Sequence, residues 1–458
     1  MDFVYQLYKN KKIGVLGFGV EGKETYLYLK KHKIEAVIFD KLERQVFLSK
    51  NDKFRFGNKL FLGEDYLEHL SEVELIFKTP GIPLLSPEIQ LAINKGVIFT
   101  SQIELFFNQC RAKIIGVTGT KGKGTTSTLI TNILRKCHKN VFLGGNIGLP
   151  AITFLDRLDE GSLAILELSS YQLQSLKKSP QIAVVLNVTQ DHLDYHKSIQ
   201  EYQRAKQNIV KYQTKQDTAI INADYLTMTP FIRKAKSKKL YYSKEKATNG
   251  CYVDHDDNLI LITPSGPIGL VRSNELLLRG RHNLENVTAA VLASFVAGAT
   301  IDSIREVVRS FHGLEHRLEL VGKTRAVTYY NDSFSTTPET AIAAIKAFTE
   351  PMVLILGGSS KNSDYHKLGK IILKSNVKVI ILIGETANQI SDSIGPNYKG
   401  QKIFGLTKMS EIVKVATNLS VPGDIILLSP ACASFGLFQD YKDRGDKFKK
   451  SVMSILHK

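Results

Sequence analysis

The stretch IIGVTGTKGKGTT, residues 114–126, decides the fold of this chain. It begins with a short apolar run that predicts a buried strand, and the residues after its glycines predict a helix to about Arg135. A glycine-rich turn between a strand and a helix points backbone N–H groups at phosphate oxygens. The stretch therefore predicts a P-loop of the form GxxGK in an α/β domain that binds ATP.

The residue types in this loop match the parts of a triphosphate site. Lys123 would place a positive charge on the transferring phosphate, and a hydroxyl is needed to face Mg²⁺. Gly124 follows the lysine, where Ser or Thr is usual, so the metal-facing hydroxyl must come from Thr125 or Thr126. We expect ATP to contact the whole loop, which consists of Gly119, Thr120, Lys121, Gly122, Lys123, Gly124, Thr125 and Thr126.

A second glycine loop, GFGVEG at residues 17–22, follows a predicted strand and opens a predicted helix. Gly17, Gly19 and Gly22 allow a tight turn and close approach of a pyrophosphate, and Asp40 ends the next strand, where an acid can bind a ribose hydroxyl. Alone, this loop would favour a nicotinamide-dependent dehydrogenase. Two nucleotide-type loops in one chain instead favour ATP together with a second, nucleotide-bearing substrate.

Alternating strand and helix patterns restart twice along the 458 residues. The alternation starts at Ile13, restarts at Ile114 and again at Ala326. It loosens between about Tyr241 and Arg279 into short pieces that suggest an antiparallel edge or an excursion from the sheet. Such alternation predicts mostly parallel sheets covered by helices. We predict three α/β domains: a Rossmann-like domain at 1–110, a P-loop ATP-binding domain at 111–312 and a second Rossmann-like domain at 313–458.

The charge of the chain is its one unusual bulk property. It has 61 Lys and Arg against 44 Asp and Glu, a formal net charge of +17, which attracts polyanions. The excess is spread along the sequence, and its densest run, residues 233–239, is typical of a solvated face. A basic nucleic-acid-binding module is therefore a minority alternative, and we expect no nucleic-acid partner.

Membrane and export signals are not recognisable in the sequence. No apolar run reaches the length of about 18 residues that a membrane helix needs, and the first twenty residues contain a strand and a glycine turn instead of a signal peptide. Four cysteines lie far apart without metal-ligand spacing, as expected for reduced thiols. We expect a cytoplasmic, monomeric enzyme with no membrane partner.

Polar residues follow two further predicted strands of the P-loop domain. The run ELSSYQL, residues 167–173, ends one of them, and NVTQDHLD, residues 187–194, ends the other. Because the carboxyl ends of parallel strands meet at one edge of a sheet, we expect both runs near the P-loop. An acid such as Glu167 can hold the Mg²⁺ that bridges phosphate oxygens.

These motifs make the chain resemble the Mur ligase superfamily, from the first glycine loop to Gly445. The block LELSSYQL, residues 166–173, resembles the branch that adds D-glutamate. The other matching stretches are residues 119–126, 144–150, 187–194, 281–286, 331–333 and 428–434.

The resemblance implies an ATP-dependent ligase of peptidoglycan precursor synthesis. The first domain would bind the uridine-diphosphate end of UDP-N-acetylmuramoyl-L-alanine, the middle domain ATP with two Mg²⁺ ions, and the last domain D-glutamate. The substrate carboxylate would attack the γ-phosphate of ATP, and the amine of D-glutamate would then open the resulting acyl phosphate.

The resemblance also implies roles for individual residues. The catalytic residues would be Lys123, Asn146, His192 and Lys206, and the metal ligands Thr125, Glu167, His192 and a carbamylated Lys206. Beyond the P-loop, ATP would be bound by Asn283, Arg317 and Asp332. The UDP substrate would be bound by Gly17, Gly19, Gly22, Asp40, Thr79 and Asn146, and D-glutamate by Thr336, Lys361, Ser434 and Tyr441.

Four positions depart from the pattern of the superfamily. Phe334 stands where many relatives have lysine, Gly436 where an acid is frequent, and Leu42 where an arginine near uracil is expected. Gly124 resembles folylpolyglutamate synthetase, a relative with the same two-step chemistry, which is the alternative function. The glycine loop at residues 17–22 opposes this alternative, because the folate enzymes begin with the ATP domain.

Overall fold

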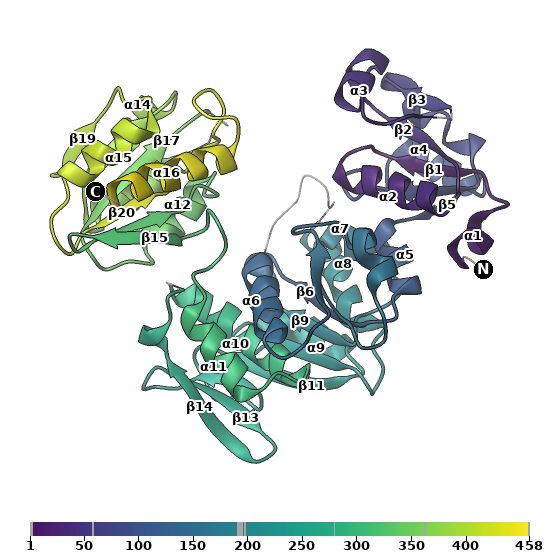
Figure 1. Cartoon of the computed structure of the whole chain (residues 1–458), viewed down its shortest axis with the longest axis horizontal. Helices are drawn as coiled ribbons and strands as arrows, with labels where there is room; N and C mark the ends of the chain where they lie inside the picture. Colours follow the sequence, from purple (N-terminus) through teal and green to yellow (C-terminus); the bar gives the residue numbers. More distant parts are fainter. Residues whose placement is uncertain are drawn as a thin grey trace. The chain divides into compact units, whose positions relative to one another are not determined.

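The computed structural model describes residues 3–56, 59–189, 196, 198–278, 280–360 and 363–456. Its strands form three sheets, and helices pack against each of them (Figure 1). Most neighbouring strands run parallel, which confirms the predicted α/β fold.

The first sheet carries the GFGVEG loop and has five parallel strands in the order β3-β2-β1-β4-β5. This is a Rossmann order, and it reverses beside β1, where such sheets bind ligands. The strands are β1 (Ile13–Leu16), β2 (Ala36–Asp40), β3 (Leu60–Leu62), β4 (Leu75–Lys78) and β5 (Ile98–Thr100). The helices are α1 (Phe3–Tyr8), α2 (Val20–Lys31), α3 (Arg44–Lys50), α4 (Pro87–Asn94) and α5 (Gln102–Gln109).

The second sheet has nine strands in the order β14-β13-β12-β11-β10-β9-β6-β8-β7. Its strands are β6 (Lys113–Thr118), β7 (Val141–Gly145), β8 (Leu163–Glu167), β9 (Ile182–Val185), β10 (Thr218–Asn222), β11 (Lys238–Ser243), β12 (Cys251–Val253), β13 (Asn258–Thr263) and β14 (Gly266–Arg272). From β7 to β12 the pairs are parallel, and β12 pairs with β13 antiparallel, which confirms the antiparallel edge expected after Tyr241.

Strand β6, which leads into the P-loop, is stabilised by burial. It lies between β8 and β9, and its Ile115 and Val117 side chains are fully buried. Burial of each of these side chains contributes roughly 1.5–3 kcal/mol to the free energy of folding. The accompanying helices are α6 (Lys123–Arg135), α7 (Ser170–Ser175), α8 (Ile199–Lys211), α9 (Thr229–Lys234), α10 (Arg281–Val296) and α11 (Ile301–Ser310).

The third sheet has six strands in the order β15-β16-β20-β17-β18-β19. Only the β15–β16 pair of this sheet is antiparallel. The strands are β15 (Glu319–Thr324), β16 (Val327–Asn331), β17 (Met352–Gly357), β18 (Val377–Ile383), β19 (Gln401–Ile403) and β20 (Ile425–Leu428). The helices are α12 (Pro338–Ile345), α13 (His366–Leu373), α14 (Ala387–Ile394), α15 (Met409–Asn418) and α16 (Tyr441–Leu456).

Packing divides the chain into two compact units. Unit 1 comprises Met1–Leu270 and Glu285–Arg305, and unit 2 comprises Val271–Leu284 and Glu306–Lys458. The first sheet and the P-loop lie in unit 1, and the third sheet lies in unit 2. The three-domain boundaries at residues 110 and 312 remain predictions.

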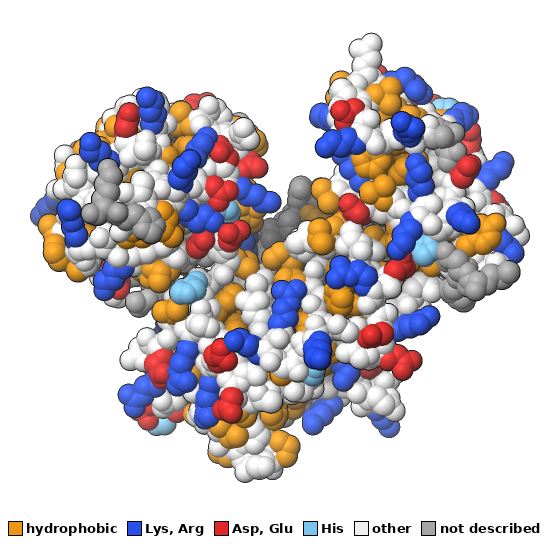
Figure 2. Space-filling view, viewed as in Figure 1, with side chains coloured by type: hydrophobic (Ala, Val, Ile, Leu, Met, Phe, Trp, Pro, Cys, Tyr) orange, Lys and Arg blue, Asp and Glu red, His pale blue; other side chains and the backbone are white. Residues whose placement is uncertain are grey.

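Surface charge is dispersed on the face shown in Figure 2, where Lys and Arg side chains are scattered among acidic and neutral ones. In the basic run 233–239, Arg233, Lys234, Lys236 and Lys238 are exposed, as expected for a solvated face. Within the described ranges, no helix has both the length and the apolar character to cross a membrane.

Candidate active site

The P-loop connects β6 to α6, and its shape depends on glycine. Gly122 has a φ of +86°, and a Cβ added there would lie 2.1 Å from Asn286 Oδ1 on α10. Any larger residue would be both strained and in collision with that side chain. The loop therefore presents its backbone close to the first turn of α6, where phosphate oxygens can reach N–H groups.

Side chains of the P-loop make defined contacts. Lys123 Nζ donates to the carbonyl oxygens of Gly119 at 3.0 Å and Thr120 at 3.1 Å, so its ammonium lies over the loop. Thr126 donates its hydroxyl to Asn286 Oδ1 at 3.4 Å. Because the Thr126 hydroxyl is engaged, the buried Thr125 is the better candidate for facing Mg²⁺.

Glu167 lies at the same edge of the sheet as the P-loop. Strand β8 pairs with β6 so that Glu167 is opposite Val117, two residues before the loop begins at Gly119. The carboxylate is buried, and Asn146 Nδ2 donates to its Oε1 at 2.9 Å. Asn146 itself is exposed, so it can face a substrate while it holds the carboxylate.

Lys206 is buried beneath the P-loop, with only 1% of its surface exposed. Its Nζ donates to the Gly119 carbonyl at 3.0 Å and to Thr118 Oγ1 at 3.4 Å, and it lies 4.7 Å from the centre of the Tyr202 ring. The Tyr202 hydroxyl contacts Thr120 Oγ1 at 3.0 Å, which ties α8 to the loop a second time. The structure thus brings Lys206 to the triphosphate loop.

Two predicted site residues, His192 and Lys361, lie outside the described residues. In the part of the chain that is described, no three His, Cys, Asp or Glu side chains form a metal-binding group. Ser359 lies two residues before Lys361, and its N–H donates to the Ala433 carbonyl at 3.0 Å. The loop that leads to Lys361 therefore runs beside the loop that carries Ser434.

The first glycine loop is built for close backbone approach. Gly17 has a φ of +85°, and a Cβ there would lie 2.3 Å from Thr79 Oγ1, whereas a Cβ on Gly19 would meet nothing within 4 Å. Gly22 packs on the Gly17 carbonyl, which a Cβ would approach to 1.9 Å. The tight turn is therefore at Gly17 and Gly22, and the open position is at Gly19.

Asp40 and Thr79 hold this loop in place. Asp40 accepts the backbone N–H of Phe18 at 2.7 Å on one carboxylate oxygen and that of Leu42 at 3.0 Å on the other. Thr79 donates its hydroxyl to the Leu16 carbonyl at 3.0 Å. Both residues predicted to bind substrate therefore also fix the conformation of the loop.

Glu21 and Lys78 are not among the residues predicted from the sequence. Gln172 Nε2 donates to Glu21 Oε1 at 2.8 Å, and burial raises the pKa of the Glu21 carboxyl. Lys78 ends β4 and donates to the carbonyls of Thr79 and Ile82, and burial lowers the pKa of its ammonium to about 8. The only local indication was position: Glu21 lies inside the first glycine loop, and Lys78 is the last residue of β4.

Unit 2 brings several predicted residues together after β16. Asp332 is buried and accepts the Leu318 N–H at 3.1 Å and the Ser429 hydroxyl at 2.7 Å. Burial raises the pKa of the Asp332 carboxyl to about 7, against the opposing effects of its hydrogen bonds and of the charge on Arg317. Asn283 lies at the start of α10 and is buried.

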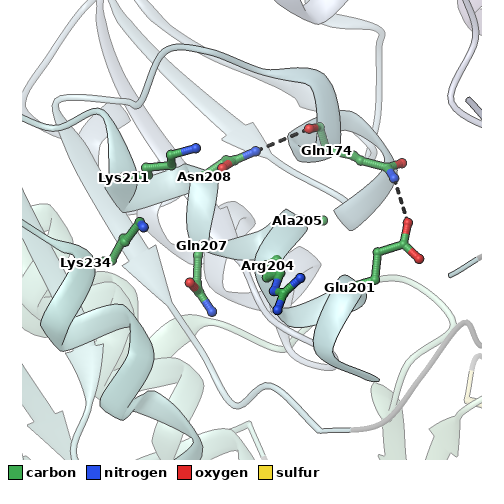
Figure 3. Close-up of a pocket in the computed structure, with 8 residues that line it drawn as sticks. All are labelled: Gln174, Glu201, Arg204, Ala205, Gln207, Asn208, Lys211 and Lys234. Atoms are coloured by element: carbon green, nitrogen blue, oxygen red, sulfur yellow. Dashed lines mark hydrogen bonds between the residues drawn. The ribbon is translucent and has the colours of Figure 1, made fainter. Parts of the chain in front are cut away.

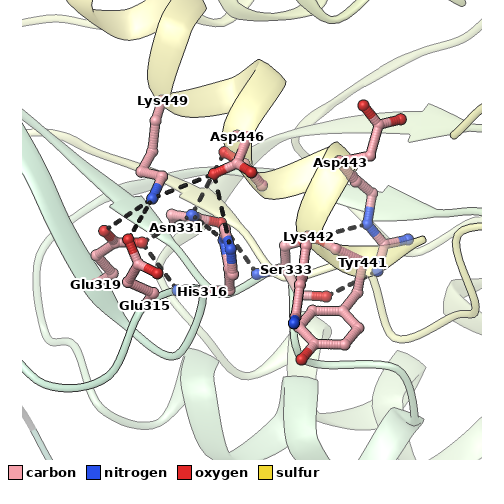
Figure 4. Close-up of polar contacts among 12 residues, drawn as sticks. Glu315, His316, Glu319, Asn331, Ser333, Tyr441, Lys442, Asp443, Asp446 and Lys449 are labelled. Atoms are coloured by element: carbon pink, nitrogen blue, oxygen red, sulfur yellow. Dashed lines mark hydrogen bonds and ion pairs between the residues drawn. The ribbon is translucent and has the colours of Figure 1, made fainter. Parts of the chain in front are cut away.

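Arg444 supports the loops that carry the predicted amino-acid site, and its partner Ser333 is among the residues drawn in Figure 4. Arg444 is fully buried, and the sequence offered no signal for it. Its Nε donates to Ser333 Oγ at 2.9 Å, and its Nη1 to the Cys432 carbonyl at 3.2 Å and the Ala433 carbonyl at 3.3 Å. Ser434 follows directly, and Ser333 Oγ donates to the Tyr441 carbonyl at 2.7 Å. Thr336 follows in the same loop as Ser333, before α12.

A separate cavity of about 380 Å³ lies on the outer side of α8 (Figure 3). Arg204, Gln207, Asn208 and Lys211 line it from one face of α8, whereas Lys206 projects from the opposite face. The cavity is therefore not part of the nucleotide site.

Three models of known domain families match the chain in order. The model described as the Mur ligase MurD-like N-terminal domain matches residues 11–101, the Mur ligase middle domain matches residues 117–294, and the Mur ligase glutamate ligase domain matches residues 316–432.

Individual relatives match over nearly their full length. The UDP-N-acetylmuramoylalanine–D-glutamate ligase of Acetivibrio thermocellus is 38% identical, over 98% of this chain and 97% of that protein. The ligase of the same name from Symbiobacterium thermophilum is 37% identical, over 97% of this chain and 98% of that protein.

The fold is also found in solved structures. The UDP-N-acetylmuramate-alanine ligase of Thermotoga maritima superposes with a TM-score of 0.59 at 17% identity, covering 97% of this chain and 100% of that chain. At this identity the similarity establishes the fold alone.

Proposed function

Because the chain belongs to the Mur ligase family, in the branch of the UDP-N-acetylmuramoylalanine–D-glutamate ligases, we propose that it joins D-glutamate to UDP-N-acetylmuramoyl-L-alanine using ATP. The structural observation that carries the proposal is the meeting of Lys123, Glu167 and Lys206 at the carboxyl ends of β6 and β8. A phosphate-binding loop, an acid and a buried lysine at one sheet edge suit phosphoryl transfer.

The proposed reaction has two steps. A carboxylate oxygen of the muramoyl-alanine substrate attacks the γ-phosphorus of ATP, the bond to the bridging oxygen breaks, and an acyl phosphate and ADP form. The amine of D-glutamate then attacks the acyl carbon, loses a proton, and orthophosphate leaves from the tetrahedral intermediate. Activation is needed because a carboxylate is a poor electrophile toward an amine in water.

Residues of the P-loop would stabilise the charge that develops in the first step. Lys123 lies over the loop, where its ammonium can move from two carbonyl oxygens to the transferring phosphoryl group. Backbone N–H groups at the start of α6 are already oriented, so they cost no reorganisation when the reaction occurs. Asn146, held on Glu167, would orient the substrate carboxylate.

The residues beside the P-loop suit Mg²⁺, which prefers oxygen ligands. The Glu167 carboxylate and the Thr125 hydroxyl, both buried at this edge, would hold one ion, and His192 with a carbamylated Lys206 would hold a second. When bound, Mg²⁺ neutralises charge on the phosphate oxygens. As an ammonium, Lys206 would repel a cation, whereas its carbamate, formed from the neutral amine and CO₂ with loss of a proton, offers an anionic oxygen.

The remaining residues divide the substrates among the three predicted domains. In 1–110, Gly17, Gly19, Gly22, Asp40 and Thr79 would bind the uridine diphosphate. In 111–312 the P-loop and Asn283 would bind ATP, which Arg317 and Asp332 of 313–458 would contact from the last domain. The D-glutamate residues would be Thr336, Lys361, Ser434 and Tyr441, a cation with hydroxyls that suits a carboxylate. We expect the chain to act as a monomer in the cytoplasm, which sedimentation and cell fractionation test.

Phosphate release tests the proposed function directly. Protein supplied with ATP, Mg²⁺, UDP-N-acetylmuramoyl-L-alanine and D-glutamate should release orthophosphate, and omission of any one component should abolish release. A panel of amino acids in place of D-glutamate establishes the acceptor. Release with folate and L-glutamate, but not with the muramoyl substrate, would instead support the folylpolyglutamate synthetase alternative that Gly124 suggests.

Oxygen tracing tests the acyl phosphate. Substrate labelled with ¹⁸O in its carboxylate should transfer one labelled oxygen to the released orthophosphate, because that oxygen bridges carbon and phosphorus in the intermediate. Unlabelled orthophosphate would exclude the proposed mechanism.

Carbamylation of Lys206 has its own measurement. Protein incubated with ¹³C-bicarbonate should show a carbamate carbon signal by NMR that is absent from Lys206→Ala. The exposed Lys215→Ala on the same unit serves as the matched control and should keep the signal. A signal that persists in Lys206→Ala would assign the carbamate to another amine.

A further inference from the structure

Phe334 lies in the loop after β16 and bridges two residues of the proposed active site. Its ring centre is 4.5 Å from the guanidinium carbon of Arg317 and 5.0 Å from the centre of the Tyr441 ring. The side chain is 40% exposed, so its two contacts lie on an accessible surface of unit 2 and not in the hydrophobic core.

The contact with Arg317 fixes the plane of the guanidinium. A cation at this distance over an aromatic ring is attracted to the negative face of the ring. Stacking covers the flat face of the guanidinium, while its N–H groups lie in the plane at the edge, which is the geometry that binds phosphate or hydroxyl oxygens. Arg317 also interacts electrostatically with Asp332, so the residue that the ring contacts is linked to a second predicted nucleotide residue.

The contact with Tyr441 fixes the direction of the phenol. The Tyr441 ring meets Phe334 edge-to-face at 89° and meets the ring of His316 at 84° over 5.9 Å. The backbone carbonyl of Tyr441 accepts the Ser333 hydroxyl at 2.7 Å. Figure 4 shows the Tyr441 side chain beside this group of polar contacts. The packing of its ring against Phe334 and His316 restricts the orientation of the phenol.

The backbone that carries Phe334 is held from several sides. The Phe334 N–H donates to the His316 carbonyl at 2.8 Å, and the Ser335 N–H donates to the Asp332 carbonyl at 2.8 Å. The preceding Ser333 accepts from the buried Arg444. A ring on a restrained backbone, with only two side-chain torsions, can define the orientation of its neighbours at little entropic cost.

We propose that Phe334 is a positioning residue that orients Arg317 toward ATP and Tyr441 toward D-glutamate through one shared ring. This proposal rests on the proposed function, which assigns those ligands to Arg317 and Tyr441. The phenylalanine also keeps a second cation away from Arg317, which a lysine at this position would introduce. One side chain then supports both the nucleotide side and the amino-acid side of unit 2.

Steady-state kinetics of Phe334→Leu tests this proposal, because leucine removes the ring and keeps an apolar side chain. The KM for ATP and the KM for D-glutamate should each rise about three- to tenfold, as expected for loss of one cation–π and one edge-to-face contact. The KM for UDP-N-acetylmuramoyl-L-alanine should stay unchanged, because its proposed loops lie in unit 1. Phe334→Tyr should restore both KM values, since it restores the ring.

Controls separate positioning from folding. Phe404→Leu removes an exposed ring elsewhere in unit 2 and should leave all three KM values at the wild-type level. Phe334→Met provides a second ring-less variant with a flexible side chain, and its circular dichroism and melting temperature should match those of the wild type. The same two KM values should rise in Phe334→Met.

The outcomes that overturn the proposal are specific. A shared positioning role would be excluded if Phe334→Leu left both KM values unchanged or raised only one of them. It would also be excluded if Phe334→Tyr did not return both KM values to the wild-type level. If wild-type protein releases no phosphate with D-glutamate, the proposed function fails instead. In that case, calorimetry of ADP binding to the wild type and to Phe334→Leu still tests whether Phe334 orients Arg317 toward the nucleotide. Equal affinities of the two proteins for ADP would exclude that role.

Discussion

Lys206 and Arg444 are the two lysine or arginine side chains that are buried within the described part of the chain. Lys206 donates to a carbonyl and a hydroxyl, and Arg444 donates to carbonyls and a hydroxyl of three residues. Burial of a cation is costly unless its N–H groups are satisfied. The two cations nevertheless have different structural roles. Lys206 lies at the P-loop, whereas Arg444 holds the loops that carry Ser333 and Ser434.

Replacement of Lys123 by Ala should lower turnover by about 10²- to 10³-fold, the loss seen when one preorganised donor to a transition state is removed. The rate of phosphate release at saturating substrate concentrations measures this change. The exposed Lys139→Ala, from the same unit, should retain wild-type turnover. A Lys123→Ala rate equal to that of the control would show that Lys123 has no role in phosphoryl transfer.

Asp332 should make stability depend on pH. Its folded-state pKa is raised to about 7, whereas an unfolded aspartate has a pKa of about 3.9, so the folded state binds this proton more tightly. Protonation of Asp332 therefore adds on the order of 4 kcal/mol to the free energy of unfolding below about pH 4. This contribution is lost as the pH rises through about 7.

Urea unfolding of the wild type and of Asp332→Asn at several pH values isolates this effect. The free energy of unfolding of the wild type relative to the variant should fall between pH 4 and pH 8, because the asparagine cannot ionise. A difference that stays constant over this range would mean that Asp332 is ionised in the folded state across it.

Helix α8 shows how one element serves packing and chemistry together. Ser198 caps its start by accepting the Glu201 N–H at 3.1 Å. Tyr202, Lys206 and Ile209 are buried on its inner face, and Arg204 is exposed on its outer face. The amphipathic spacing therefore directs Lys206 to the P-loop as a consequence of burying the apolar residues beside it.

Truncation of Ile209 should destabilise α8 without touching the chemistry. Ile209→Ala removes a fully buried side chain and should lower the free energy of unfolding by about 2–5 kcal/mol. The exposed Arg204→Ala on the same helix should change it by less than about 0.5 kcal/mol. Chemical denaturation of the two variants measures both values, and equal effects would mean that the inner face of α8 is not packed as described.

At the scale of the whole molecule, the two compact units carry different parts of the chemistry. The residues proposed for uridine diphosphate and the P-loop are in unit 1, and the residues proposed for D-glutamate are in unit 2. A ligand that binds only one unit should protect only that unit, because protection follows local contacts.

UDP should therefore slow amide hydrogen exchange in one unit. We expect protection in residues 16–22 and 78–82, the loops around Gly17 and Thr79, and no change in residues 352–383 of unit 2. Mass spectrometry of peptides from protein with and without UDP measures this. Protection confined to unit 2 would place the uridine site elsewhere.

The predictable part of the fold was the part encoded by local pattern. Strands β1, β6 and β8 were predicted because each is a short apolar run before a turn. In β6 every residue after Lys113 is buried, which is what such a run indicates. Strands β3 and β19 were not predicted; each has three residues and lies at the edge of its sheet.

The candidate site divides in the same way. The P-loop, Glu167 and the first glycine loop could be recognised from spacing, and Lys206, Arg317 and Tyr441 only from the resemblance to a family. Glu21, Lys78, Arg444 and the bridging contacts of Phe334 were not recognised as parts of the site, because nothing in their own neighbourhood distinguishes them from ordinary charged or aromatic residues.

The sequence by itself determined the α/β class, the two phosphate loops and the strand-end acids, because each depends on residues only a few positions apart. The tertiary structure alone decided which side chains meet: Lys206 reaches Gly119 across 87 positions, Arg444 reaches Ser333 across 111, and Gln172 reaches Glu21 across 151. Such partners are chosen by packing of the folded chain. Their hydrogen bonds satisfy buried polar groups that no local pattern reveals.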